Sequence, residues 1–131
     1  MNAKTKIYFN LAKMYDFVCD ASDIWNNEDP KSKSYKHSIN MCLLQIGEYA
    51  NRISQIQDEE NIIIVSDKNI DFKNIRGIRN RIAHSYTNID YSIIDDVMNN
   101  DIPNLKNFLE SFVNKEILDD PYILYESEYN D

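Results

Sequence analysis

Three arginines, a histidine and a tyrosine lie within eleven residues of an acidic chain, in the stretch RGIRNRIAHSY from Arg76 to Tyr86. An imidazole that titrates near neutral pH can act as a general base or acid, and a guanidinium can hold two phosphate oxygens at once. The stretch is therefore either a basic, solvated piece of helix or a site built to handle phosphate.

The charge around these residues differs from that of the whole chain. The formal net charge of −8 argues against a general nucleic-acid binder, because neutralising phosphates needs clustered Lys and Arg. However, residues 116–131 carry six acids and no Lys or Arg, which leaves 16 acids and 14 bases in residues 1–115. Residues 73–88 hold four bases and no acid. This basic cluster is an isolated positive patch in a negative molecule.

Helices are expected to position this stretch, because 43% hydrophobic residues with two glycines and three prolines favour a mostly helical globule. Apolar residues recur at steps of three and four over residues 7–25 and 39–56, which predicts two long amphipathic helices with a break near Pro30. Residues 62–65 predict a buried connector, since four apolar residues alone make no sheet. The last long helix, residues 93–112, should be kinked or split at Pro103, which lacks a backbone donor.

These elements predict an all-α fold, a four- to five-helix up-down bundle that forms a single helical domain over residues 1–118. Residues 119–131 are expected to be an acidic C-terminal tail, solvated or disordered unless it covers a basic groove or contacts a partner. Asp71 is expected to cap a short helix that holds the motif. Gly47 lies inside the second long helix, where either another backbone comes close or the glycine is merely tolerated.

A helical wheel separates the arginines of the motif. At ~100° per residue, Ile75, Ile78 and Ile82 cluster on one side and define a buried stripe. Arg79 lies at the edge of this stripe, whereas Arg81 points away from it and is expected to be solvated surface. The arginines are therefore not equivalent.

Two interpretations of Arg79 remain open: it forms a structural ion pair with a carboxylate such as Glu48, or it lines a wet cleft. His84 lies ~140° from Arg79 on an uninterrupted helix. The two side chains converge only if the helix ends or bends near Ala83, or if a second subunit brings its own copy across a two-fold axis. Taken alone, His84 could instead cap a helix end, and Tyr86 could be a packing aromatic.

The residues around this motif resemble a known family. The stretch RNRIAHSY fits the Arg-x4-His-x-Tyr motif of the HEPN superfamily, with Asn directly after the Arg. The blocks CLLQIGEYANRIS, FKNIRGIRNRIAHSYTNIDYSIIDDV and NDIPNLKNFLE are similar to the HepT-like toxins of HepT/MntA toxin–antitoxin systems. The resemblance is close over residues 39–112, and residues 5–27 match only as a generic first helix. Asp71 and Phe72 stand where many relatives have Pro-Trp, which affects the start of the motif helix more than its chemistry.

The resemblance implies a metal-independent endoribonuclease that acts as a homodimer with a composite active-site groove. Carried over by position, it assigns catalysis to Arg79 and His84, a supporting or RNA-binding role to Asn80 and Arg76, and the AMP-acceptor role to Tyr86. The implied partner is a minimal nucleotidyltransferase antitoxin, which silences the toxin by adding AMP to that tyrosine. RNA is the expected substrate and DNA is not, because the 2′-hydroxyl is the nucleophile. No metal or other cofactor is expected.

A second interpretation is a non-catalytic subunit that presents a nucleotide or RNA to a nucleotidyltransferase partner. The negative net charge and the lack of a broad basic surface favour it, and it predicts binding that survives the loss of His84. Cys19 and Cys42 have no CxxC spacing, and no apolar run approaches the ~20 residues of a membrane span. We therefore expect a soluble protein in a reducing cytoplasm, with no membrane partner.

Overall fold

A computed structural model describes residues 1–29, 33–88 and 92–129 of the chain. The backbone is helical over most of these ranges and contains no β-strand within them. The elements are α1 (Ala3–Asn27), α2 (Lys33–Glu60), α3 (Phe72–Arg76), α4 (Ile78–Asn88), α5 (Ser92–Asp96), the π-helical turn η1 (Val97–Asp101), α6 (Ile102–Phe112), α7 (Lys115–Asp119) and α8 (Ile123–Tyr129). The predicted all-α helical bundle is confirmed.

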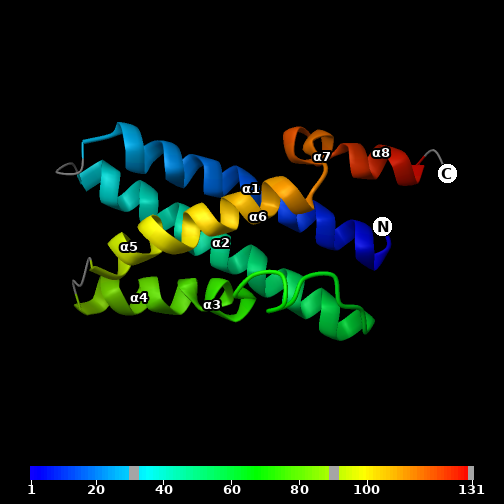
Figure 1. The fold of residues 1–131 in the computed structure, drawn as a ribbon, viewed down its shortest axis with the longest axis horizontal. Helices are drawn as coiled ribbons and strands as arrows, with labels where there is room; N and C mark the ends of the chain where they lie inside the picture. Colours follow the sequence, from blue (N-terminus) through cyan, green and yellow to red (C-terminus); the bar gives the residue numbers. More distant parts are fainter. Residues whose placement is uncertain (30–32, 89–91, 130–131) are drawn as a thin grey trace.

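The two longest helices, α1 and α2, run antiparallel and cross at an angle (Figure 1). The Asn2 side chain caps α1 by accepting a hydrogen bond from the Thr5 N–H at 2.8 Å. The apolar stripe predicted for α1 is buried, with Ile7 and Leu11 at 0% and 1% exposure. Each helix thus has one face that must be covered, and the two faces cover each other.

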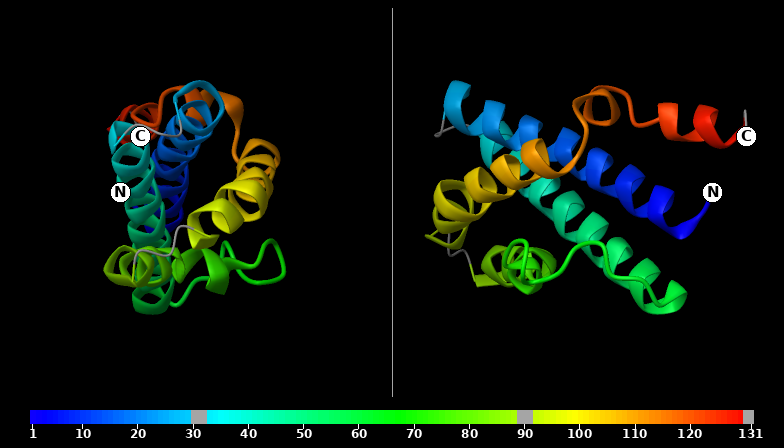
Figure 2. Two further views of the ribbon diagram at one scale, coloured as in Figure 1. Left: turned by 90° about the vertical axis from the view of Figure 1, so that its left-hand side faces the viewer. Right: turned by 45° about the vertical axis from the view of Figure 1, so that its right-hand side comes forward.

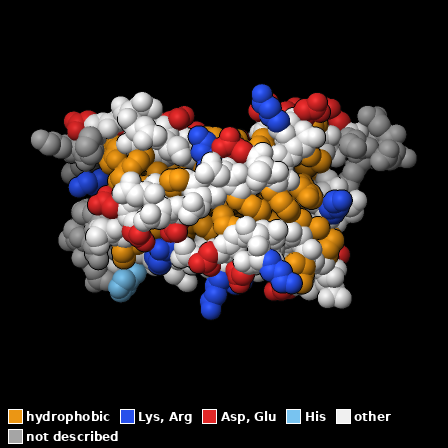
Figure 3. Space-filling model, in the orientation of Figure 1, with side chains coloured by type: hydrophobic (Ala, Val, Ile, Leu, Met, Phe, Trp, Pro, Cys, Tyr) orange, Lys and Arg blue, Asp and Glu red, His pale blue; other side chains and the backbone are white. Residues whose placement is uncertain are grey.

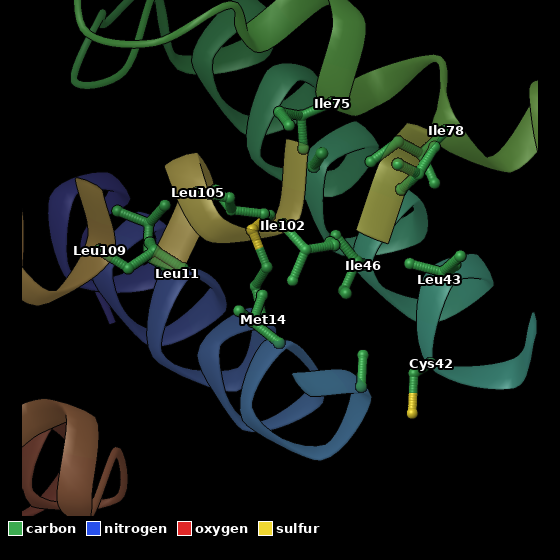
Figure 4. Close-up of a cluster of buried hydrophobic side chains, with 14 of the residues drawn as sticks. Leu11, Met14, Cys42, Leu43, Ile46, Ile75, Ile78, Ile102, Leu105 and Leu109 are labelled. Carbon is green, nitrogen blue, oxygen red and sulfur yellow. The ribbon is translucent and has the colours of Figure 1, made fainter. Parts of the chain in front are cut away.

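The remaining helices pack on this hairpin from two directions. Figures 1 and 2 show α3 and α4 along α2, while the path from α5 to α6 lies across the hairpin, where η1 and α6 contact α1. Figure 4 shows the core where these elements meet. Its labelled side chains are Leu11 and Met14 from α1, Cys42, Leu43 and Ile46 from α2, Ile75 from α3, Ile78 from α4, and Ile102, Leu105 and Leu109 from α6.

The connector between α2 and α3 is only partly buried. Asn61 ends α2 with a positive φ of 52°. The Gln57 side chain then fixes the chain, because its Oε1 accepts hydrogen bonds from the N–H groups of Ile64 and Val65 at 2.9 and 2.8 Å. Val65 is buried at 1% exposure, whereas Ile63 is 78% exposed. The predicted buried connector is therefore correct for Val65 and wrong for Ile63, which is exposed to solvent.

The predicted division of the last long helix at Pro103 is confirmed. The π-helical turn η1 precedes α6, and Pro103 lies in the first turn of α6. A backbone N–H at that place has no acceptor within α6, so proline costs α6 no hydrogen bond. The Ile102 N–H donates to the carbonyl of Val97, five residues earlier. The wider turn therefore separates α5 from α6 just before the proline, while the backbone keeps right-handed helical angles at Asp101 and Ile102.

The acidic segment after residue 118 is attached to the bundle in its described part. Phe9 of α1 meets Tyr122 and Tyr125 edge-to-face, with ring centroids 5.5 and 5.1 Å apart, and the Lys13 ammonium lies 5.6 Å from the Tyr122 ring. A disordered end is therefore ruled out for this part, because residues 123–129 form α8 and aromatic residues among the acids pack on α1, although Tyr122 and Tyr125 stay 55% and 48% exposed. The domain boundary near residue 118 stays a prediction. No described helix is both long and apolar enough to span a membrane.

Candidate active site

The candidate site forms where α4 approaches α2 most closely. A Cβ atom built on Gly47 would lie 2.9 Å from the Arg79 backbone nitrogen and 3.0 Å from the Arg79 Cβ. Any side chain at residue 47 would therefore push α4 away, since such contacts are shorter than real Cβ atoms normally make. Of the two explanations for this glycine, the structure supports the close approach of another backbone, and that backbone belongs to Arg79 itself.

The Arg79 side chain is held by a carboxylate of α2. Its Nη1 donates to Glu48 Oε2 at 2.9 Å, so the predicted ion pair is present. The two side chains are 56% and 36% exposed, which places the pair at the surface and not in the bundle interior. An ion pair this exposed contributes only about 0–1 kcal/mol to stability. Its main effect is to orient the guanidinium.

Arg79 and Glu48 line a shallow groove of about 880 Å³ between α2 and α4, which we call the α2–α4 groove. Its lining residues are Leu44, Gln45, Glu48, Arg52, Arg79, Asn80 and Ala83. Both interpretations of Arg79 therefore hold together: the guanidinium has an acidic partner, and it also borders a solvent-filled groove.

Basic and acidic side chains alternate on the face shown in Figure 3, with several basic side chains along the edge formed by α3 and α4. The basic side chains of this edge are interspersed with acidic ones, two of which form the ion pairs of Glu48 with Arg79 and of Asp101 with Arg81.

His84 lies further along α4 than the groove lining, and its side chain is exposed. The helix continues unbroken past it to Asn88, so Arg79 and His84 stay ~140° apart around the axis. The first route to convergence, a helix end near Ala83, is therefore absent. The backbone of Tyr86 belongs to α4, but its side chain lies outside the described part of the structure.

The assigned supporting residues differ in their surroundings. Asn80 is exposed and lines the α2–α4 groove beside Arg79. Arg76 is half-buried; its Nη1 donates to Ser54 Oγ on α2 at 2.9 Å, and its guanidinium lies 5.9 Å from the Phe72 ring. Arg76 thus ties α3 to α2, and its RNA-binding role stays a prediction.

Arg81 is not the solvated surface residue that the wheel predicted. Its side chain is 31% exposed, and its Nη2 donates to Asp101 Oδ2 at 2.9 Å. The other oxygen of Asp101 accepts a hydrogen bond from Asn74 Nδ2 at 2.8 Å. The wheel treated the motif helix in isolation, whereas η1 covers a second face of it. Asp101 therefore fastens both α3 and α4 to the π-helical turn.

The N-terminal end of the motif helix follows the sequence prediction in part. Asp71 caps α3, since its Oδ1 accepts a hydrogen bond from the Asn74 N–H at 3.2 Å. However, a turn at Gly77 separates α3 from α4, so Arg76 lies on α3 whereas the Arg-x4-His-x-Tyr motif lies on α4. Ile75, Ile78 and Ile82 are all buried, as the wheel predicted.

One groove residue, Arg52, was not singled out by the sequence. Its signal is weak: Gln45, Glu48 and Arg52 recur at steps of three and four along the polar face of α2. Such spacing is common on any exposed helix, and only the position of α4 makes it part of a groove. In the described part of the chain, no group of three or more His, Cys, Asp or Glu side chains could hold a metal ion.

Comparison with known proteins gives one family. The profile of the family described as "Ribonuclease HepT-like" matches residues 13–112. Three proteins of Methanocaldococcus jannaschii, each provisionally named an RNase, are similar over most of their length. Two are 26% identical over 110 residues, covering 84% of this chain and 90% or 86% of the relative. A third is 27% identical over 109 residues, covering 83% of this chain and 94% of the relative. No solved structure gives a significant match.

Proposed function

This chain belongs to the HepT-like ribonuclease family, and from that membership we propose that it is a toxin that cleaves RNA as a metal-independent endoribonuclease. The observation that carries the proposal is the position of Arg79: its guanidinium is oriented by Glu48 and borders the α2–α4 groove. His84 follows on the same helix and is exposed. Similar proteins named as RNases support the same reaction class.

The proposed reaction uses the RNA's own 2′-hydroxyl as the nucleophile. The His84 imidazole accepts the 2′-hydroxyl proton while the oxygen forms a bond to the adjacent phosphorus. Arg79 stabilises the additional negative charge on the phosphorane oxygens. The bond to the 5′-oxygen then breaks, and that oxygen takes up a proton. The products are a 2′,3′-cyclic phosphate and a 5′-hydroxyl, and DNA is inert because it lacks the nucleophile.

The test of this reaction uses protein whose intact mass shows no modification. A labelled single-stranded RNA is incubated with a chelator and with wild type, Arg79→Ala or His84→Ala protein, and a DNA of the same sequence serves as the substrate control. We expect cleavage of RNA by the wild type alone. If the wild type leaves RNA intact, or His84→Ala cleaves equally well, the proposal fails. Binding without cleavage that survives the loss of His84 supports the non-catalytic subunit instead.

We further propose that the site is composite, with Arg79 of one protomer and His84 of a second copy bordering one groove of a homodimer. This proposal is supported by the unbroken course of α4, which keeps the two side chains of one chain on different sides. Mixing Arg79→Ala with His84→Ala protein tests it. After free subunit exchange, half of the dimers are mixed and each contains one intact groove, so about one quarter of wild-type activity should return. No return of activity would show that each chain forms its own site.

The proposed partner is a nucleotidyltransferase antitoxin that transfers AMP from ATP to the phenol oxygen of Tyr86, releasing pyrophosphate. The position of Tyr86, two residues after His84 on α4, supports this acceptor role. A bound AMP adds bulk and negative charge, which repels an incoming phosphate backbone. Treatment with the antitoxin and ATP should raise the intact mass by one AMP and abolish cleavage, whereas Tyr86→Phe should stay active and unmodified. An unchanged mass, or modification of Tyr86→Phe, would refute the assignment.

A further inference from the structure

The four arginines of the chain differ in what holds their guanidinium groups. Arg76, Arg79 and Arg81 each donate a hydrogen bond to a side chain of another helix or turn. Arg52 forms no ion pair within residues 1–29, 33–88 and 92–129; its guanidinium instead lies over the ring of Tyr49, 4.9 Å from the centroid. Arg52 therefore carries a positive charge that no carboxylate neutralises in the described structure.

The Tyr49 ring gives Arg52 a defined position. Tyr49 is half-buried and packs against Phe17 of α1, with ring centroids 5.9 Å apart. A guanidinium that rests on a fixed aromatic face loses part of its rotamer freedom before any ligand arrives, which lowers the entropic cost of binding. The outer edge of the guanidinium stays available for hydrogen bonds, because the side chain is exposed.

Arg52 borders the same α2–α4 groove as the proposed catalytic arginine. It follows Glu48 by four residues, so it lies one helical turn, ~6 Å, further along α2 than the carboxylate that orients Arg79. Two guanidinium groups that border one groove, one from α4 and one from α2, can each bind a phosphate of the same single strand.

We propose that Arg52 binds the phosphate next to the scissile phosphate of single-stranded RNA, so that the α2–α4 groove holds two successive phosphates. This inference rests on the proposed ribonuclease function, since Arg79 is taken to bind the scissile phosphate. Arg52 touches neither the nucleophile nor the leaving group, so its contribution is to substrate binding and register. A guanidinium can hold the neighbouring phosphate through two parallel hydrogen bonds.

The first test measures binding without cleavage. Fluorescence anisotropy of labelled, single-stranded 2′-O-methyl RNA, which lacks the nucleophile, is recorded with wild type, Arg52→Ala and Arg52→Lys at several salt concentrations. We expect Arg52→Ala to bind about tenfold more weakly and to lower the slope of log affinity against log salt by about 0.7, the value for one lost phosphate contact to a single strand. Arg52→Lys should keep the slope and recover part of the affinity.

The matched control is Lys115→Ala, which removes one exposed positive charge from α7, outside the α2–α4 groove. It should leave the affinity and the salt slope unchanged. Equal losses for Arg52→Ala and Lys115→Ala would show that only net charge matters, and no loss for Arg52→Ala would remove Arg52 from the RNA-binding surface. Either result overturns the proposal. Because this test needs no cleavage, it decides the role of Arg52 even if the ribonuclease proposal fails.

The second test varies the length of the substrate. A dinucleotide contains only the scissile phosphate, whereas a trinucleotide with a single 2′-hydroxyl has one cleavable linkage and one neighbouring phosphate. Trinucleotides with the neighbour on either side are compared. We expect Arg52→Ala to cleave the dinucleotide as the wild type does and to lose about tenfold in kcat/KM on one of the two trinucleotides. An equal loss on all substrates, or no loss on either trinucleotide, would overturn the subsite, because neither depends on the neighbouring phosphate.

Discussion

Replacing Gly47 by alanine should impair the proposed chemistry far more than it impairs folding. The added Cβ would lie 2.9 Å from the Arg79 nitrogen, and ordinary contact begins at 3.4 Å, so α4 must move outward by about 0.5 Å at Arg79. Both atoms of the clash belong to backbone or to a Cβ, so a side-chain rotation cannot relieve it.

Two opposing terms set the stability of the Gly47→Ala variant. Alanine inside a helix gains about 1 kcal/mol over glycine, whereas forcing an extra methyl group into a packed contact costs about 1–3 kcal/mol. The net loss in the free energy of unfolding should therefore be about 0–2 kcal/mol. The effect on catalysis should be larger in proportion, because a 1 Å misplacement can cost about 100-fold in rate. A shift of half that size predicts roughly a tenfold loss of kcat.

The chain's second glycine supplies the control. A Cβ on Gly77 would meet its nearest neighbour, the Asn74 carbonyl oxygen, at 3.4 Å, and the backbone there has an ordinary φ of −77°. Gly77→Ala should therefore be neutral or stabilising by about 0.4–1 kcal/mol, with unchanged kcat. Urea unfolding and single-turnover cleavage of RNA measure both quantities. If Gly47→Ala cleaves as fast as Gly77→Ala, the close approach of α4 does not position Arg79 for catalysis.

Three further changes have defined outcomes. Asp101→Ala should lower the free energy of unfolding, measured in urea, by about 1–3 kcal/mol, because it removes the carboxylate that pairs with the half-buried Arg81. Asp96 contacts the same arginine from its exposed side, so Asp96→Ala should change the free energy of unfolding by less than about 0.5 kcal/mol. Glu48→Gln should change stability by less than about 1 kcal/mol yet tighten RNA binding at low salt, since it removes a negative charge from the groove; weaker binding would contradict this. Burial raises the pKa of the Cys42 thiol from 9.0 to about 11, so the unfolded chain ionises first and stability should fall from pH 9 to pH 11; thermal unfolding of Cys42→Ala should show a smaller fall.

Much of the positioning of the site follows from local sequence. Asp71 caps a helix because a carboxylate before an apolar period satisfies the first N–H groups. Ile75, Ile78 and Ile82 are buried because their spacing places them on one face. Pro103 divides the last helix because it has no N–H, whatever surrounds it. Each of these predictions depends on residues within one or two turns of the chain.

The parts that the sequence did not predict depend on which helix covers which face. Arg81 looks solvated until η1 brings Asp101 against it, 20 residues later in the chain. Arg52 looks like any exposed base until α4 lies beside α2 and creates a groove. The role of Gly47 is of the same kind, since a glycine inside a helix becomes informative only when the neighbouring backbone is known. These are tertiary relations, and helical periodicity within one element carries no record of them.

The unbroken course of α4 also affects how the proposed activity depends on the concentration of the protein. If each protomer contributes half of a reactive groove, the number of working grooves at low abundance rises with the square of the protomer concentration. Leaky expression would then produce mostly silent monomers, and harm would begin at a threshold set by the dissociation constant of the dimer. The proposed antitoxin would then need to modify only the chains in excess of this threshold. Specific activity that falls on dilution of the pure protein is the signature of this behaviour.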